Sequence, residues 1–432
     1  MKKSRSKSIL CVGLAMVLSL SLFAGCKSTT TTPTSSTKKE NLTIMHYVVE
    51  TGKLKALNDT VDGFKKANPN VTVTVQGMSL DQYTSTLNMK ISAGDMPDIM
   101  FGNPKTYSNL VTAGDIKDIS NESYAKRVDP SALLDCTFNG KAYGVPMDLM
   151  LSGVVYNKDI FTKDNITIPK TFDDFVGVMK TLKADGTVPV AAGYKDMASV
   201  GGSYWAQSFG NMLSQNPEMF GDIMSGAKKP SDFPLLKQFL TQWQTINTYT
   251  GTESTSVGID RAEQDFGSGK DGMIIIGSWA ISSIRQYGPN GNFGAFLFPF
   301  FNTAAQNKMQ YNTDDTWMIA QNAPDADAAN KFFSYMTSNA AATTWANDCP
   351  AVSAITGVTA SKLDPILADM AATLKSGAAC NVDKGICLSG QYASTWDTQM
   401  QAWCFTQPGY SVDTFFSKSL DPAIANARTT GT

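Results

Sequence analysis

The sequence predicts an α/β protein built on mainly parallel sheets. Residues 42–101 alternate between short apolar stretches of strand length and stretches with helical periodicity, in the order β-α-β-α-β. The same alternation returns after residue 171. The chain has 432 residues, of which 42% are hydrophobic and 10% aromatic, so it can bury a large core in two domains or one large one.

The first half of the pattern is the clearest. Residues 42–48 are predicted to form a buried strand, and the helix that follows carries an apolar face that ends at Asn68-Pro69: Leu54, Leu57, Val61 and Phe64. Valine alternates with threonine over 71–75, which predicts a second strand. Ser79 and Gln82 form a capping box that opens a helix ending at Gly94, and residues 98–101 are the third strand.

The second half repeats these features. Thr171 and Asp174 are predicted to cap a helix that Gly186 closes, and residues 188–192 follow as a strand. Residues 260–266 are predicted to be helical. Residues 272–277 form a short buried strand, and Trp279 comes directly after it.

A ligand site is expected at one edge of the sheet, because ligands of such folds bind outside the carboxyl ends of the strands. Three loops meet there, over residues 46–51, 76–79 and 102–106, and Trp279 follows a strand in the same way. The candidate contact residues in the loops are Tyr47, Glu50, Gln76 and Asn103. No glycine-rich phosphate loop follows any strand, so nucleotides are not the expected ligand.

Composition excludes several other classes of function. The net charge is −2, which argues against nucleic-acid binding. His46 is the only histidine, so a multi-histidine metal site is excluded, and a Ser-His-Asp triad would need His46 itself. We expect no cofactor and no metal. Five cysteines follow Cys26 with no CxxC spacing, and they are predicted to be structural thiols or to form one or two bridges: Cys136, Cys349, Cys380, Cys387 and Cys404.

The N-terminus has the features of a targeting segment. A basic stretch precedes an apolar run over 9–24, which is too short for a membrane span and suits a signal peptide of residues 1–25. The sequence Leu22-Phe23-Ala24-Gly25-Cys26 resembles a bacterial lipobox, although Phe23 stands where that motif prefers leucine. The resemblance implies diacylation of Cys26. Residues 26–40 are rich in serine and threonine and are predicted to form a flexible tether.

Several motifs, in order and over roughly residues 41–350, resemble the extracellular solute-binding proteins of ABC importers, specifically the carbohydrate-binding family that includes maltodextrin-binding proteins. The matching stretches are GFKKANPNVTVTV (63–75), SAGDMPDIMF (92–101), NGKAYGVP (139–146), VVYNKDIF (154–161), IPKTFDDF (168–175) and FGSGKDGMIIIGSW (266–279). The last 70 residues match weakly.

The resemblance implies a fold of two α/β lobes joined by crossing segments, with the ligand cleft between them. The N-terminal lobe would comprise 41–149 and 317–358, and the C-terminal lobe 150–316 and 359–432. It also implies a monomer, tethered to the outer face of the membrane, that delivers a sugar to permease subunits.

Carried over residue by residue, the family's contact positions fall on ten residues: Tyr47, Glu50, Asn103, Asp148, Tyr204, Trp205, Trp279, Asp314, Asp315 and Trp396. Gly102 stands where maltodextrin binders have tryptophan, and the match at Trp396 is loose. Aromatic rings suit the apolar faces of sugars, and carboxylates accept hydrogen bonds from hydroxyls.

Three alternatives stay open at this point. The same fold could bind another small solute such as a peptide, polyamine, metal or anion. The protein could also sense sugar for a membrane receptor instead of serving import. A surface glycosidase would need two suitably placed carboxylates, and Glu50, Asp148, Asp314 and Asp315 are the available ones.

Overall fold

The computed structural model describes residues 39–196, 200, 206–349, 351–382, 391–407 and 409–430. Five elements of the sequence predictions lie outside the described residues: the signal peptide, Cys26, Cys387, Tyr204 and Trp205. Only the last two residues of the tether are described. In the described part, each helix is too short or too polar to cross a membrane.

Ten strands form one mixed sheet, whose main path runs β2-β1-β3-β10-β6-β8-β7. Strands β9 and β11 pair with β6, and β12 pairs with β10. The strands are β1 (Glu40–His46), β2 (Val71–Gly77), β3 (Ile99–Phe101), β6 (Val145–Asn157), β7 (Val188–Ala191), β8 (Asp271–Gly277), β9 (Phe293–Phe296), β10 (Met309–Ile319), β11 (Val352–Ser353) and β12 (Ala379–Asn381). A separate hairpin joins β4 (Thr137–Phe138) and β5 (Lys141–Ala142).

The pairing differs in part from the expected mainly parallel sheets. Parallel pairing holds for β1 with β2 and β3, for β7 with β8, and for β10 with β12. The long strands β6 and β10 instead pair antiparallel with each other. Strand β6 also pairs antiparallel with β8 and β9, and β10 pairs antiparallel with β3. The physical reason is that these two strands run in opposite directions between the two halves of the sheet, so each half contains a strand opposed to its parallel neighbours.

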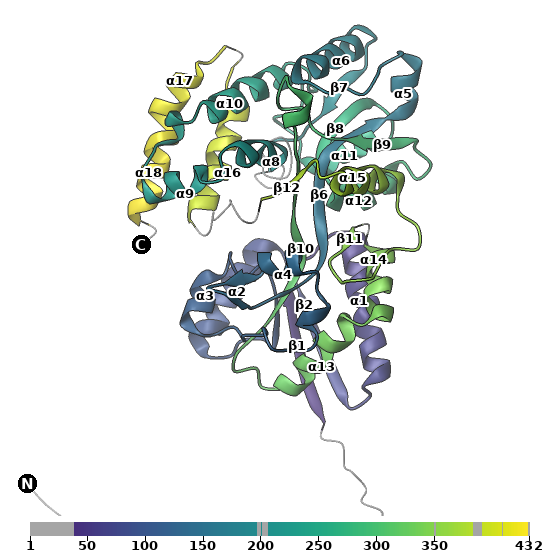
Figure 1. Ribbon diagram of the computed structural model, residues 1–432, viewed down its shortest axis with the longest axis vertical. Helices are drawn as coiled ribbons and strands as arrows, with labels where there is room; N and C mark the ends of the chain where they lie inside the picture. The colour runs from purple at the N-terminus through teal and green to yellow at the C-terminus, as the bar shows by residue number, and fades with distance from the viewer. Residues whose placement is uncertain are drawn as a thin grey trace, which may run out of the picture. The chain divides into compact units, whose positions relative to one another are not determined.

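Strand β6 crosses from one half to the other. Its residues 145–151 pair with β10, and its residues 152–157 pair with β8 and β9. Figure 1 shows β6 and β10 running between the two groups of helices and strands. The buried side chains divide in the same way: two clusters draw on residues 42–147 and 317–355, and two others on residues 151–309 and 366–424. We call these the N-terminal and C-terminal lobes; their exact boundaries remain a proposal.

Helices cover both halves of the sheet. Those of the N-terminal lobe are α1 (Thr51–Ala67), α2 (Leu80–Ala93), α3 (Ser108–Ala113), α4 (Pro130–Asp135), α13 (Ala326–Met336) and α14 (Asn339–Asp348). Those of the C-terminal lobe are α5 (Lys158–Lys163), α6 (Phe172–Ala184), α8 (Ala206–Gln215), α9 (Met219–Ser225), α10 (Pro234–Asn247), α11 (Ile259–Gly267), α12 (Ile281–Tyr287), α15 (Pro365–Lys375), α16 (Gln391–Cys404), α17 (Val412–Phe415) and α18 (Asp421–Thr430).

Local sequence signals account for the positions of these elements. Both predicted capping boxes are formed, at Ser79 with Gln82 and at Thr171 with Asp174. Gly94 adopts φ = 68°, the left-handed conformation that ends α2 and that glycine adopts without steric cost. The strand-helix-strand order therefore places the β1–α1 loop, the end of β3 and the end of β8 where a ligand site was expected.

Candidate functional site

A cavity of about 630 Å³ lies where the β1–α1 loop faces α11 and the end of β8. Its N-terminal-lobe lining is Tyr47, Val48, Val49, Glu50, Thr51, Lys53 and Phe101. The crossing strands contribute Met150 and Asp314, and the C-terminal lobe contributes Ile259, Asp260, Glu263, Trp279 and Ser283. The cavity thus combines aromatic rings, four carboxyl groups and one ammonium group.

Tyr47 is held at the end of β1 by other aromatic rings. Its ring meets Tyr83 and Phe101 edge-on, with centroids 5.0 and 4.8 Å apart. Burial is the main reason that the pKa of Tyr47 is raised, so the phenol keeps its proton. Beyond it, Glu50 precedes α1 and accepts a hydrogen bond from the Val49 N–H at 3.2 Å. Val49 is 67% exposed, so this loop presents an apolar side chain and a carboxylate together.

Trp279 is positioned by the strand before it. It lies in the short turn η4 (Ser278–Ala280), and Ser278 Oγ accepts a hydrogen bond from the Leu151 N–H of β6 at 3.2 Å. The indole lies against Gly277: a Cβ there would be 2.6 Å from Nε1 of the ring. The ring is half-buried, packs on the core of the C-terminal lobe and lines the cavity.

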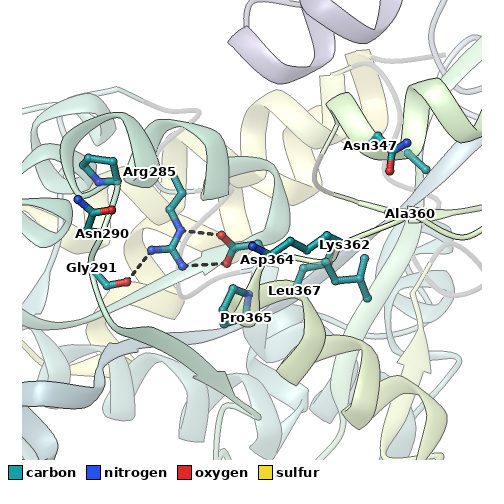
Figure 2. A pocket seen from close by; sticks show the side chains of 12 residues that line it. Arg285, Asn290, Gly291, Asn347, Ala360, Lys362, Asp364, Pro365 and Leu367 are labelled. Carbon is teal, nitrogen blue, oxygen red and sulfur yellow. Dashed lines mark hydrogen bonds and ion pairs between the residues drawn. The ribbon is translucent and has the colours of Figure 1, made fainter.

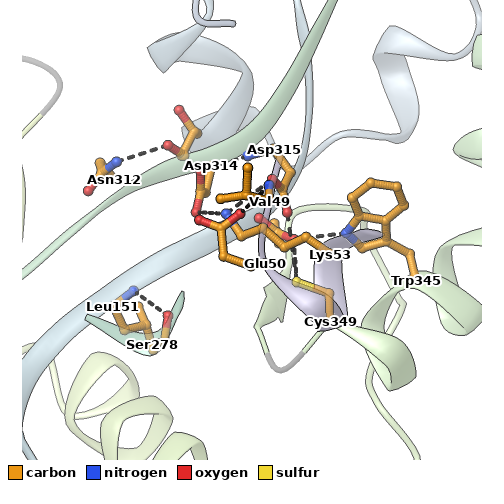
Figure 3. A network of polar contacts seen from close by, with 12 residues as sticks. Val49, Glu50, Lys53, Leu151, Ser278, Asn312, Asp314, Asp315, Trp345 and Cys349 are labelled. Atoms are coloured by element: carbon orange, nitrogen blue, oxygen red, sulfur yellow. Dashed lines mark hydrogen bonds and ion pairs between the residues drawn. The ribbon is translucent and has the colours of Figure 1, made fainter. Parts of the chain in front are cut away.

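Lys53 joins the cavity to a buried group of acids (Figure 3). Its Nζ is 2.6 Å from Asp314 Oδ2 and 3.1 Å from Asp315 Oδ1. Burial disfavours the charged ammonium, but the carboxylates of Asp314, Asp315 and Asp148 outweigh burial and hold the pKa of Lys53 well above its usual value. Lys53 is therefore charged at neutral pH.

The backbone of Asp315 explains how two consecutive carboxylates reach one ammonium. Successive side chains of a strand normally point to opposite faces. Asp315 has φ = 42°, a left-handed conformation that does not keep this alternation. The register with β6 is the same on both sides of it, with Asp314 opposite Asp148 and Thr316 opposite Pro146, so no residue is inserted. Asp314 lines the cavity, whereas Asp315 lies buried behind it.

Asp148 and Asp315 form the buried end of this network. Asp148 Oδ2 accepts hydrogen bonds from Trp345 Nε1 at 2.9 Å and from the Cys349 thiol at 3.5 Å, and the same thiol is 3.7 Å from Asp315 Oδ2. Burial, followed by the charge of neighbouring aspartates, raises the pKa of both carboxyl groups. Burial also raises the pKa of the Cys349 thiol, so it stays protonated and donates.

Asp148, Asp315 and Cys349 are also the described residues that could together hold a metal ion, since their ligand atoms lie within 4.8 Å of one another. The Lys53 ammonium already supplies the positive charge 3.1 Å from Asp315. A metal cation would add a second positive charge beside it, and the protonated thiol would have to lose its proton to bind. The donor set therefore fits the ammonium better than a metal.

Glu263 is a buried acidic residue on the side of the cavity that the C-terminal lobe forms. It is 3% exposed, and its Oε1 has no hydrogen-bond partner among the described residues. Burial, opposed by a hydrogen bond from Ser283 and assisted by the charges of Asp260 and Glu50, raises the pKa of Glu263 to about 8. The group therefore carries a proton at neutral pH for most of the time.

A second cavity, of about 490 Å³, lies between α12, α14 and the segment 360–367 (Figure 2). Arg285 binds Asp364 through two contacts of 2.6 and 3.1 Å and donates to the Gly291 carbonyl at 2.6 Å. Asp364 also caps α15. These groups satisfy one another, and the lining residues include no aromatic ring, so this cavity is a weaker candidate for a ligand site.

The structure gathers some of the expected site residues and separates others. Tyr47, Glu50, Trp279 and Asp314 line the main cavity, and Asp148 and Asp315 lie behind it, each 1% exposed. Asn103 does not line it: its amide is 3.4 Å from Thr313 Oγ1, and its Oδ1 accepts from the Lys105 N–H. Gln76 is likewise absent from the lining.

Trp396 requires a correction. It was expected to stack on a ligand, but its ring is 1% exposed and packs edge-on against Phe220 with a centroid distance of 5.7 Å. The reason is that Trp396 lies on the side of α16 that faces the core of the C-terminal lobe, where it belongs to the largest buried cluster. It is a core residue.

Sequence reasoning missed Lys53, Asp260, Glu263 and Ser283. A signal was present for two of them. Lys53 lies one helical turn before Leu57 on the buried face of α1, and Glu263 lies three residues before Phe266 on that of α11. A charged residue on the apolar face of a helix, near its N-terminus, must find a partner or line a cavity. Asp260 and Ser283 carry no such signal.

Comparisons with known proteins identify the family and the fold. The family model for bacterial extracellular solute-binding proteins matches residues 59–372. The multiple sugar-binding protein of Streptococcus mutans is 24% identical over 335 residues, 76% of this chain and 78% of that protein. The maltooligosaccharide ABC transporter solute-binding lipoprotein of Streptococcus pneumoniae is 23% identical over 341 residues, 76% of both. The solved complex of the solute-binding protein RafE with raffinose superposes with a TM-score of 0.75 at 22% identity, covering 90% of this chain and 98% of that one. The two-lobed fold is therefore shared.

Proposed function

We propose that this chain, which belongs to the family of bacterial extracellular solute-binding proteins, binds an oligosaccharide in the cavity between its lobes. One observation carries the proposal. The half-buried ring of Trp279 lines the same cavity as Glu50, Asp260 and Asp314. Together they offer a flat apolar surface and several hydrogen-bond acceptors.

These are the two kinds of contact that a sugar ring needs. The C–H face of a pyranose packs on an indole or phenol ring, which provides large contact area with little loss of side-chain entropy. The hydroxyls donate to carboxylates, and hydrogen bonds to charged groups contribute about 1.5–3 kcal/mol each. The names of the two Streptococcus relatives, a multiple sugar-binding protein and a maltooligosaccharide ABC transporter solute-binding lipoprotein, support the same class of ligand.

The ligand is released unchanged. A glycosidase needs one carboxylic acid and one carboxylate that both reach the scissile bond. Asp148 and Asp315 are instead enclosed by Trp345, Cys349 and Lys53. Asp314 is paired with Lys53 at 2.6 Å, and the unpartnered oxygen of the protonated Glu263 is buried, so Glu50 has no suitably placed acid beside it. The bound sugar passes to the permease of an ABC transporter, and the protein acts as a monomer held outside the cell membrane by lipid on Cys26. The lipobox-like sequence and the name of the pneumococcal lipoprotein support this location.

The experiment is a thermal-shift screen of the chain from residue 39 with raffinose, maltotriose, galactotriose and xylotriose, followed by calorimetry of each hit. A ligand that binds only the folded state raises the melting temperature, by the equivalent of about 2.7 kcal/mol at a hundred times its Kd. Peptides and polyamines form the comparison arm. A shift with peptides or polyamines and none with any sugar would overturn the proposal, and so would release of reducing ends from a bound sugar.

A further inference from the structure

The charges that line the main cavity are unbalanced. Besides Glu263, which is mostly protonated at neutral pH because its pKa is about 8, the lining has three acidic residues, Glu50, Asp260 and Asp314, against one basic residue, Lys53. Lys53 already contacts Asp314 at 2.6 Å and Asp315 at 3.1 Å. Its positive charge is therefore committed to two aspartates, and the described lining has no cation left for an acidic ligand.

Two internal segments outside the described residues bring no net charge. Residues 197–199 and 201–205 contain no charged side chain, and residues 383–390 contain one acid and one base, Asp383 and Lys384. Arg285 on α12, a cation that lines the second cavity, is bound to Asp364 through two contacts. It belongs to a different lining.

The environment of Glu263 indicates how strongly a negative charge is disfavoured in this part of the main cavity. Glu263 is 97% buried, and Oε1 has no partner among the described residues. Burial and the charges of Asp260 and Glu50 favour its protonated form and raise its pKa to about 8. A ligand carboxylate placed in this cavity would lose water and meet the same two acids, whereas an uncharged sugar hydroxyl would not be repelled by them.

From this geometry we propose that the cavity selects uncharged sugars and rejects sugar acids, and that Glu50 and Asp260 set this selectivity. The inference rests on the proposed sugar-binding function and names the class of sugar. Glu50 acts from the N-terminal lobe and Asp260 from the C-terminal lobe, so an acidic ligand would be opposed from both sides of the cavity. Asp314 contributes less, because Lys53 neutralises it.

The test compares matched pairs of sugars that differ in charge. Raffinose, maltotriose and galactotriose are each measured beside the form whose primary alcohols are oxidised to carboxylates. For the wild type, calorimetry should give a Kd at least about tenfold lower for the neutral sugar that binds than for its oxidised form. In the double variant Glu50→Gln/Asp260→Asn, this ratio should shrink by at least about threefold, even though both forms bind more weakly.

Glu218→Gln is the matched control, because it removes an exposed acid of the C-terminal lobe that does not line the cavity. It should leave the ratio unchanged. Equal affinity of the wild type for a neutral sugar and its oxidised form overturns the inference alone. A ratio that the double variant leaves unchanged also overturns it, since the rejection would then be steric. Failure of every neutral sugar to bind overturns the proposed function and this inference with it.

Discussion

At the scale of single residues, the proposed sugar site is expected to depend most on Trp279. The sequence pattern predicted that this residue follows a buried strand, which the structure confirms, and the structure adds that it is half-buried and lines the cavity. A half-buried ring loses less packing on truncation than a core tryptophan would, so its effect on folding and its effect on binding can be separated.

Trp279→Ala should lower the affinity for the cognate sugar by about 30-fold, equivalent to about 2 kcal/mol, because the sugar loses its stacking surface. The melting temperature without sugar should fall by only a few degrees. Tyr287→Ala on α12 is the control, since it removes an exposed ring outside the cavity lining. Calorimetry and melting curves on the same samples give both numbers. A steep fall in melting temperature with affinity intact would assign Trp279 to the core instead.

Asp315 is the other residue whose role can be tested singly. Its left-handed backbone costs most residues roughly 1–2 kcal/mol, but asparagine tolerates it. Burial and Asp148 raise the pKa of Asp315 in the folded state, so the folded state binds its proton more tightly than the unfolded chain does. The wild type therefore loses stability from this group as the pH rises above the unfolded pKa of about 3.8.

Asp315→Asn cannot titrate, so it should gain stability relative to the wild type as the pH rises from 4 to 8. The measurement is the difference in melting temperature between the two proteins at several pH values. A difference that stays constant, or that shrinks towards pH 8, would mean that Asp315 is ionised in the folded state throughout this range.

At the scale of helices and strands, much of the fold could be predicted because each local signal is short-range. The capping boxes at Ser79 and Thr171 and the valine-threonine alternation over 71–75 each fix an element within a few residues. The pairing of the crossing strands was harder to predict from the sequence. The antiparallel pairing of β6 with β10 joins residues about 165 positions apart, and no local pattern specifies it.

The same distinction applies to the site. Tyr47, Glu50 and Trp279 follow strands, so their shared edge could be predicted from topology and resemblance. Lys53 and Glu263 enter from helices, where their orientation depends on how the lobes pack. The left-handed backbone of Asp315 could not be predicted from the sequence, because aspartate occurs in extended as well as left-handed backbone.

Gly277→Ala tests how β8 supports the site. A Cβ at this position would stand 2.6 Å from Nε1 of Trp279, so the ring must move although tryptophan is still present. The affinity for sugar should fall by about tenfold, by loss of the stacking geometry. Gly177→Ala on α6, where a Cβ meets nothing within 4 Å, is the control and should stabilise its helix by up to about 1 kcal/mol. Unchanged affinity in Gly277→Ala would show that the ring position is not critical.

At the scale of the whole molecule, the lipid anchor is expected to determine where the protein acts. Two acyl chains on Cys26 would hold it at the membrane, since stable anchoring takes two such chains or an equivalent second signal. Cys26→Ser should move the protein from the membrane fraction into the culture medium with its sugar affinity unchanged. Immunoblots of the two fractions measure this. A serine variant that is secreted normally yet sediments with membranes would exclude the anchor.

The network around Lys53 lies where the crossing segments of the molecule meet. Asp148 belongs to β6, Asp314 and Asp315 belong to β10, and Cys349 directly follows α14. Lys53 comes from the N-terminal lobe and lines the cavity. A bound sugar would contact Glu50 and Asp314 on one side of the cavity and Asp260 and Trp279 on the other. Its contacts would therefore link the two lobes at their junction.

Binding should accordingly close the lobes by a hinge motion at these connections, because a ligand favours the state in which it makes more contacts. Small-angle scattering should show a smaller radius of gyration at saturating sugar than without it. At about three times the wild-type Kd, which occupies roughly three-quarters of the wild type, Trp279→Ala should keep the larger radius, because binding that is about 30-fold weaker leaves only about one molecule in ten occupied. A radius that does not change although calorimetry confirms binding would mean that the sugar enters a cavity whose lobes are already closed.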